Sequence, residues 1–117
     1  IVSLHVPFMK GTERMIRRAH FRTMQRSAVF INTARAELIE AGALHDALKK
    51  RWIAGAAVDV LDNEQSDGKH LKRDLLVRYA RTHENLIILP HVGGTTFEAM
   101  ETTQVFLAEL VRKSLRR

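Results

Sequence analysis

The sequence contains no cysteine among its 117 residues. The protein can therefore form neither disulfides nor thiolate metal sites, which fits a reducing compartment, and we expect no metal site. Apolar residues make up 45% of the chain, yet no apolar run approaches the roughly 18 to 20 residues of a membrane span. No signal-peptide pattern occurs either, so the sequence favours a soluble, cytoplasmic, globular protein.

The formal net charge is +6, a property shared with many nucleic-acid-binding proteins. Aromatic residues do not alternate with the basic ones, however, and no known nucleic-acid-binding motif occurs. The lysines and arginines gather instead near the expected ends of helices, where a cation interacts favourably with the helix macrodipole. We therefore favour solvated helix ends over a polyanion-binding surface, and we expect neither a nucleic-acid nor a membrane partner.

Short apolar runs typical of strands alternate with segments that have helical spacing. Strands are expected over residues 2–6, 29–33, 54–61 and 86–89, and helices over residues 12–18 (with Thr12 as N-cap), 40–52, 71–80 and 96–113. This alternation indicates βαβ units, which form a parallel sheet with right-handed crossovers. The predicted fold class is α/β, with helices flanking the sheet.

Polar residues that can do chemistry follow the expected strands. They are His5, Arg35, Glu64 and His91, while Asp59 ends the most apolar strand. Taken singly, such an arginine or histidine is more often a surface or loop residue, but the carboxyl ends of parallel strands share one edge, where α/β proteins place their active sites. An unpaired carboxylate would be costly to bury, so Asp59 should have a polar partner at that edge. The other histidines, at positions 20, 45, 70 and 83, are expected to be solvated.

Four blocks of sequence, in order along the chain, look like family signatures. They are SLHVP at 3–7, FINTAR at 30–35, IAGAAVDV at 53–60 and LPHVGG at 89–94. Together they resemble the nucleotide-binding domain of the D-isomer-specific 2-hydroxyacid dehydrogenases. The spacing is similar too, because 24 positions separate Arg35 from Asp59 and 5 separate Asp59 from Glu64. The resemblance implies a Rossmann-like parallel sheet.

The resemblance also implies hydride transfer between NAD(P) and a D-2-hydroxy acid/2-oxo acid pair. The planar guanidinium of Arg35 would bind the substrate carboxylate and carbonyl oxygen. His91 would protonate that carbonyl oxygen as the hydride arrives, and would take the proton back in oxidation. Glu64 would hydrogen-bond His91, orient it and favour the imidazolium. These three are the expected catalytic residues.

The same resemblance assigns a set of cofactor-binding residues. Asp59 would accept a hydrogen bond from the nicotinamide carboxamide, and the full set is His5, Val6, Pro7, Thr33, Ala34, Arg35, Asp59, His91, Gly93 and Gly94. NAD is the expected cofactor, with NADP left open because the residue that reads the ribose is missing. Relatives usually pair through this domain, so a homodimer is expected.

Some features depart from the family pattern. Ala36 follows Arg35 where glycine is usual, Gln65 replaces a common proline, and the loop after Glu64 is longer and more polar. No G-x-G-x-x-G motif occurs, nor the acidic residue that follows it to bind the ribose. Residues 1–117 are therefore interpreted as the second half of a dinucleotide-binding domain, with the G-x-G-x-x-G half and the substrate domain absent, and the isolated chain is expected to be inactive.

An alternative function remains open. Some relatives are nucleotide-sensing transcriptional corepressors, so the chain could be a non-catalytic, nucleotide-sensing or protein-binding module. The presence of Arg35, Glu64 and His91 together favours an enzyme, because a scaffold does not need all three.

Overall fold

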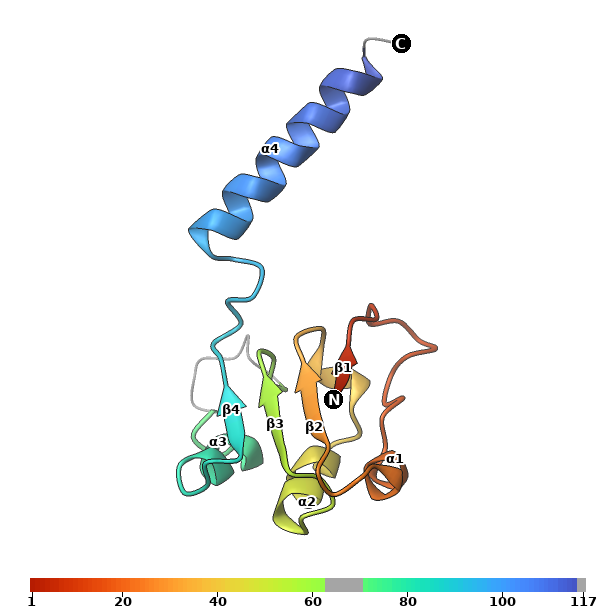
Figure 1. Cartoon of the computed structure of the whole chain (residues 1–117), viewed down its shortest axis with the longest axis vertical. Helices are drawn as coiled ribbons and strands as arrows, with labels where there is room; N and C mark the ends of the chain where they lie inside the picture. The colour runs from red at the N-terminus through yellow and green to blue at the C-terminus, as the bar shows by residue number, and fades with distance from the viewer. Residues whose placement is uncertain (63–70, 116–117) are drawn as a thin grey trace.

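The computed structural model describes residues 1–62 and 71–115, and its centre is a four-stranded parallel sheet (Figure 1). The strands are β1 (Val2–Leu4), β2 (Val29–Asn32), β3 (Gly55–Val58) and β4 (Leu86–Ile88), and they lie side by side in that order. All three neighbouring pairs are parallel, so the four carboxyl ends share the edge that is uppermost in Figure 1. The predicted α/β class is confirmed.

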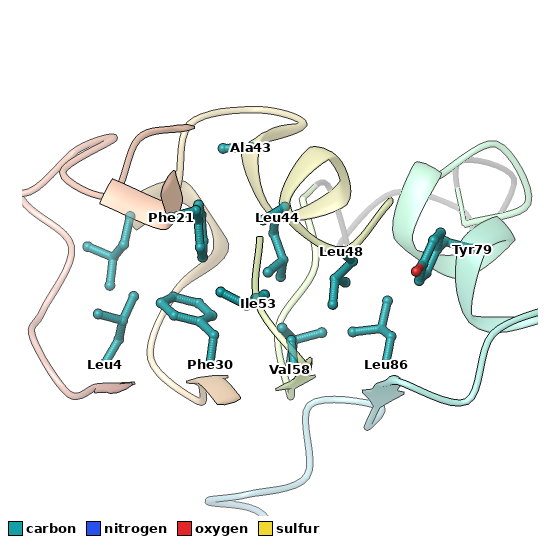
Figure 2. Close-up of a cluster of buried hydrophobic side chains, with 13 residues drawn as sticks. Leu4, Phe21, Phe30, Ala43, Leu44, Leu48, Ile53, Val58, Tyr79 and Leu86 are labelled. Carbon is teal, nitrogen blue, oxygen red and sulfur yellow. The ribbon is translucent and has the colours of Figure 1, made fainter. Parts of the chain in front are cut away.

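The helices are α1 (Arg18–Thr23), the 3-10 helix η1 (Ala36–Leu38), α2 (Ala43–Lys49), α3 (Leu75–Ala80) and α4 (Phe97–Ser114). The first four lie in the connections between strands, and α1, α2 and α3 pack on one face of the sheet. Alternate strand residues face these helices, as the period of a β-strand requires. Figure 2 shows this core, which includes Leu4, Phe30, Val58 and Leu86 of the strands and Phe21, Leu44, Leu48 and Tyr79 of the helices.

The core contains an aromatic pair. The rings of Phe21 and Phe30 meet edge to face with centroids 5.0 Å apart, and both side chains are fully buried. On the opposite face of the sheet, Val29 and Ile87 remain 37% and 58% exposed. The helices α1 to α3 therefore cover one face, and the buried side chains on that face fix the orientation of the strands.

One ion-pair cluster joins α1 to α2. Arg18 Nε donates to Asp46 Oδ2 at 2.6 Å, the Arg18 main-chain N–H donates to Glu40 Oε2 at 3.1 Å, and the guanidinium also pairs with Glu40. The side-chain hydrogen bond from Arg18 holds the pKa of Asp46 below its usual value. The main-chain hydrogen bond from Arg18 does the same for the pKa of Glu40.

The helix expected over Thr12–Arg18 is wrong. Thr12 does not cap a helix: its Oγ1 donates to the Pro7 carbonyl at 2.8 Å and accepts from the Met9 N–H at 2.9 Å, which closes a turn. Ile16 then forms a parallel bridge with Ile39, and α1 begins only at Arg18. Threonine side chains stabilise turns and helix starts with the same kind of hydrogen bond, so the residue type alone could not separate the two.

Helix α4 stands away from the sheet (Figure 1). Thr96, the first residue of the expected helix, is its N-cap, because its Oγ1 accepts from the Ala99 N–H at 3.2 Å. None of its residues is buried, including the apolar side chains of Phe97, Phe106 and Leu110. Within residues 1–62 and 71–115, no helix combines the length and apolar character needed to cross a membrane.

Candidate active site

The loops that leave the four strands meet at the carboxyl edge of the sheet. The loop after β1 begins with His5, the loop after β2 contains Arg35, the residue after β3 is Asp59, and the loop after β4 contains His91. Parallel topology therefore brings the predicted residues within the described part of the chain to one edge, as expected. Glu64 and Gln65, together with His70, lie outside the described residues.

The loop after β1 contains the predicted residues His5, Val6 and Pro7, of which only Val6 is half-buried. His5 is exposed, and its Nε2 lies 2.8 Å from Ser3 Oγ. Val6 is half-buried against the core, while Pro7 is exposed and its carbonyl accepts from Thr12. The strand ends at Leu4, so His5 to Pro7 form a loop rather than the end of the expected strand.

The loop after β2 is organised by Asn32, a residue that the sequence reasoning did not assign to the site. Asn32 is 1% exposed. Its Oδ1 accepts from the Ala34 N–H at 3.1 Å, and its Nδ2 donates to the Arg35 carbonyl at 2.9 Å. Thr33 and Arg35 are exposed and Ala34 is half-buried. The sequence does contain a feature that points to this role, because Asn32 ends an apolar strand and a buried amide there must find hydrogen-bond partners.

Arg35 directs its guanidinium along its own loop. Its Nη1 donates to the Ala34 carbonyl at 2.7 Å, which leaves further N–H groups of the exposed fork for a ligand. Ala36, where the family usually has glycine, begins η1 and does not have a positive φ. The absence of glycine at this position therefore causes no left-handed strain in the backbone.

Asp59 has the polar partner that its position predicted. The carboxylate is 2% exposed, and its two oxygens accept from successive main-chain N–H groups, Val92 to Oδ1 at 2.9 Å and Gly93 to Oδ2 at 2.8 Å. Both donors belong to the loop that contains His91. Among the described residues, the carboxylate is thus stabilised by backbone N–H dipoles rather than by a cation.

His91 is exposed and lies in the left-handed region, with φ +56°. Histidine tolerates this region better than most residues, but the conformation still requires support from its surroundings. Its carbonyl accepts from Thr95 Oγ1 at 3.3 Å. Gly93 fits closely, because a Cβ there would lie 2.7 Å from Asp59 Oδ2, whereas a Cβ at Gly94 would meet nothing within 4 Å. The loop is therefore shaped around the Asp59 carboxylate.

A cavity of about 270 Å³ lies beneath this edge, between η1, α2 and α3. Its walls include Asn32 and Val58 at the strand ends, and Asp62 and Asp74 at its acidic side. Partial desolvation raises the pKa of Asp62, and the carboxylates of Glu37 and Asp74 add to this effect. Neither Arg35 nor His91 lines this cavity, so it is distinct from the edge where those two residues lie.

The prediction of solvated histidines away from the edge is wrong for His45. Its side chain is 19% exposed, and its ring meets Tyr79 edge to face at 5.7 Å between centroids. His83 is exposed, but its ring stacks on the Tyr79 ring with centroids 3.9 Å apart. Both rings serve packing around α3, which the helical spacing of the sequence does not reveal.

Comparison with known proteins gives a consistent result. A glyoxylate reductase of Thermococcus litoralis is 38% identical over 114 residues, which cover 97% of this chain and 30% of that protein. A D-3-phosphoglycerate dehydrogenase of Methanocaldococcus jannaschii is 35% identical over 115 residues, covering 98% of this chain and 20% of that protein. The chain thus spans about a third or less of the length of these relatives.

Solved structures agree with this comparison. The NAD-complexed form of a D-isomer specific 2-hydroxyacid dehydrogenase from Lactobacillus delbrueckii ssp. bulgaricus matches with a TM-score of 0.75 and 32% identity, covering 97% of this chain and 36% of that one. The sequence model for the NAD binding domain of the D-isomer specific 2-hydroxyacid dehydrogenases matches residues 1–93. The chain belongs to the family of D-isomer specific 2-hydroxyacid dehydrogenases, in its NAD binding domain.

Proposed function

We propose that this chain is part of an NAD-dependent dehydrogenase that interconverts a D-2-hydroxy acid and its 2-oxo acid. The observation that carries the proposal is the placement of Arg35 and His91 on the loops after β2 and β4, on either side of β3, at the carboxyl edge of a parallel sheet. Open α/β sheets bind ligands at this edge. A cation and an imidazole there suit an anionic substrate that exchanges a proton.

Arg35 would bind the substrate carboxylate and the neighbouring carbonyl oxygen through two parallel N–H groups. His91 would donate a proton to the carbonyl oxygen in reduction and remove the hydroxyl proton in oxidation. The bound cofactor supplies or accepts the hydride at the substrate carbon. Glu64 would orient His91, a role that the resemblance to the family supports.

The residues at the edge fit the nicotinamide part of a dinucleotide. Small or main-chain groups face the solvent there, and a Cβ at Gly94 would meet nothing within 4 Å, so a flat ring can approach closely. We assign the cofactor contacts to residues 5–7, Thr33, Ala34, Arg35, Asp59, His91, Gly93 and Gly94. NAD is the proposed cofactor, and NADP would require a ribose-reading residue outside this chain.

The wider setting forms part of the same proposal. Residues 1–117 would be one half of a dinucleotide-binding domain, with the G-x-G-x-x-G half and the substrate domain supplied by a longer protein. We further propose a homodimer that pairs through this domain in the cytoplasm, without nucleic-acid or membrane partners.

Turnover separates this proposal from a nucleotide-sensing module. The complete protein should consume NADH in the presence of a short 2-oxo acid such as glyoxylate, and substitution of His91 should remove that turnover. If the complete protein binds NADH but turns over none of a panel of 2-oxo acids, the enzymatic proposal is wrong. The exposed apolar side of α4 would then support the protein-binding alternative.

A further inference from the structure

Asn32 and Asp59 are the buried polar residues of the described chain, at 1% and 2% exposure in an otherwise apolar core. They occupy equivalent places at the carboxyl ends of β2 and β3. Burying an amide or a carboxylate is costly unless its hydrogen-bonding groups are satisfied. Both side chains make their hydrogen bonds to the main chain of a neighbouring loop. This indicates that each side chain holds that loop in place.

Each residue type matches the loop that it binds. The Asn32 amide has an acceptor oxygen and a donor NH₂ group, and it faces one N–H (Ala34) and one carbonyl (Arg35). The Asp59 carboxylate has two acceptors and faces two N–H groups, those of Val92 and Gly93. Exchanging the two side-chain types would place like groups against each other in both loops.

The two anchors are also joined to each other. The Asp59 N–H donates to the Asn32 carbonyl at 3.0 Å, directly beyond the paired residues Asn32 and Val58 of the sheet. A movement of either strand end is therefore transmitted to the other loop. Residues 91–94 are all exposed, so burial in the core does not position this loop.

We propose that Asn32 and Asp59 act as one positioning unit that fixes Arg35 and His91 relative to each other. The unit also supports the left-handed backbone of His91, whose two following residues supply the N–H groups that Asp59 binds. The catalytic meaning of this positioning rests on the proposed function. The anchoring hydrogen bonds themselves form within the folded chain and need neither cofactor nor substrate.

Amide hydrogen exchange of the full chain, measured by NMR without cofactor, tests the anchoring. Asp59→Asn should increase the exchange rate of Val92 or Gly93 at least tenfold, because an amide N–H₂ replaces one of the two acceptor oxygens. Asn32→Leu, which removes the acceptor of the Ala34 N–H, should do the same for Ala34. Core amides should keep their protection in both variants. The matched control is Asp62→Asn, an exposed carboxylate three positions further on, which should leave all these rates unchanged.

A second variant serves if Asp59→Asn fails to fold. Gly93→Ala leaves the carboxylate in place but adds a methyl group 2.7 Å from Asp59 Oδ2, so the loop must shift. The Val92 amide should again lose protection. Unchanged exchange at Val92 and Gly93 in the folded variants would overturn the proposal.

Kinetics of the complete enzyme test the catalytic meaning. Both Asp59→Asn and Asn32→Leu should lower kcat at least tenfold, because misplaced groups slow the reaction. Asn32→Leu, which removes no assigned cofactor contact, should also leave the KM for NADH within about twofold. A raised KM for NADH in Asp59→Asn, with unchanged kcat and unchanged loop exchange, would leave Asp59 with its cofactor contact alone and refute the positioning role. If the wild-type protein has no turnover at all, the proposed function fails, while the exchange rates still decide the anchoring.

Discussion

Replacement of Arg35 by lysine isolates the contribution of the guanidinium fork in the complete enzyme. Arg35 is exposed and makes one side-chain bond within the described chain, from Nη1 to the Ala34 carbonyl. The substitution keeps the positive charge and disturbs no packing. The free energy of unfolding should therefore change by less than about 0.5 kcal/mol, the usual range for surface substitutions.

The kinetic effect should be much larger. A fork that binds a carboxylate and a carbonyl oxygen makes two parallel charge-assisted hydrogen bonds, and lysine can replace only one of them well. Each such bond contributes about 1.5–3 kcal/mol net. The value of kcat/KM for the 2-oxo acid should consequently fall by roughly 10- to 150-fold.

Two measurements decide the result. Steady-state NADH oxidation gives kcat/KM for the oxo acid, and fluorescence titration gives the Kd for NADH, which should barely change. Equal losses of oxo-acid and cofactor affinity would show that Arg35 supports the structure of the edge and does not bind substrate. A matched drop in thermal stability would lead to the same conclusion.

Three further predictions concern the chain itself. Phe30→Ala should lower the free energy of unfolding by about 3–5 kcal/mol in urea titration, since Phe30 is fully buried against Phe21, whereas the neighbouring Val29→Ala, 37% exposed, should cost about 1 kcal/mol or less. Arg18→Met should lower Tm near neutral pH. Because folding lowers the pKa values of Glu40 and Asp46, these carboxylates stabilise the protein at pH values above their unfolded pKa values. The difference in Tm between the variant and wild type should therefore vanish as the pH falls through the folded pKa values. A Tm difference that stays constant with pH would refute this linkage. Calorimetry should detect little or no NAD binding by the 117-residue chain, which has no G-x-G-x-x-G motif, and micromolar affinity would contradict this.

The layout of the sheet could be predicted because it depends on local patterns. Short apolar runs separated by helical spacing are sufficient to indicate parallel strands, and parallel strands bring their carboxyl ends together. Arg35, Asp59 and His91 could therefore be assigned to one edge. The need for a polar partner at Asp59 also followed from burial alone.

The parts that could not be predicted depend on contacts between distant residues. The donors to Asp59 come from residues more than thirty positions away, at Val92 and Gly93, and no local pattern identifies them. Asn32 was not recognised as a site residue because its role appears only when the Ala34–Arg35 loop folds back onto its amide. Thr12 was assigned to a helix because its hydroxyl suits either a helix start or a turn, and the bridge from Ile16 to Ile39 decided between them.

The most direct test of the account is the rate of hydride transfer in the complete enzyme after His91→Ala. His91 is exposed at the carboxyl edge, so removal of its side chain should leave the fold intact. Measurement at saturating cofactor separates the chemical step from any change in NADH affinity. Loss of an acid–base group usually costs about 100-fold or more, and here kcat should fall by that factor for both NADH-dependent reduction of the 2-oxo acid and NAD-dependent oxidation of the hydroxy acid. Rates within about threefold of wild type in either direction would contradict the assignment of His91 as the proton donor and acceptor.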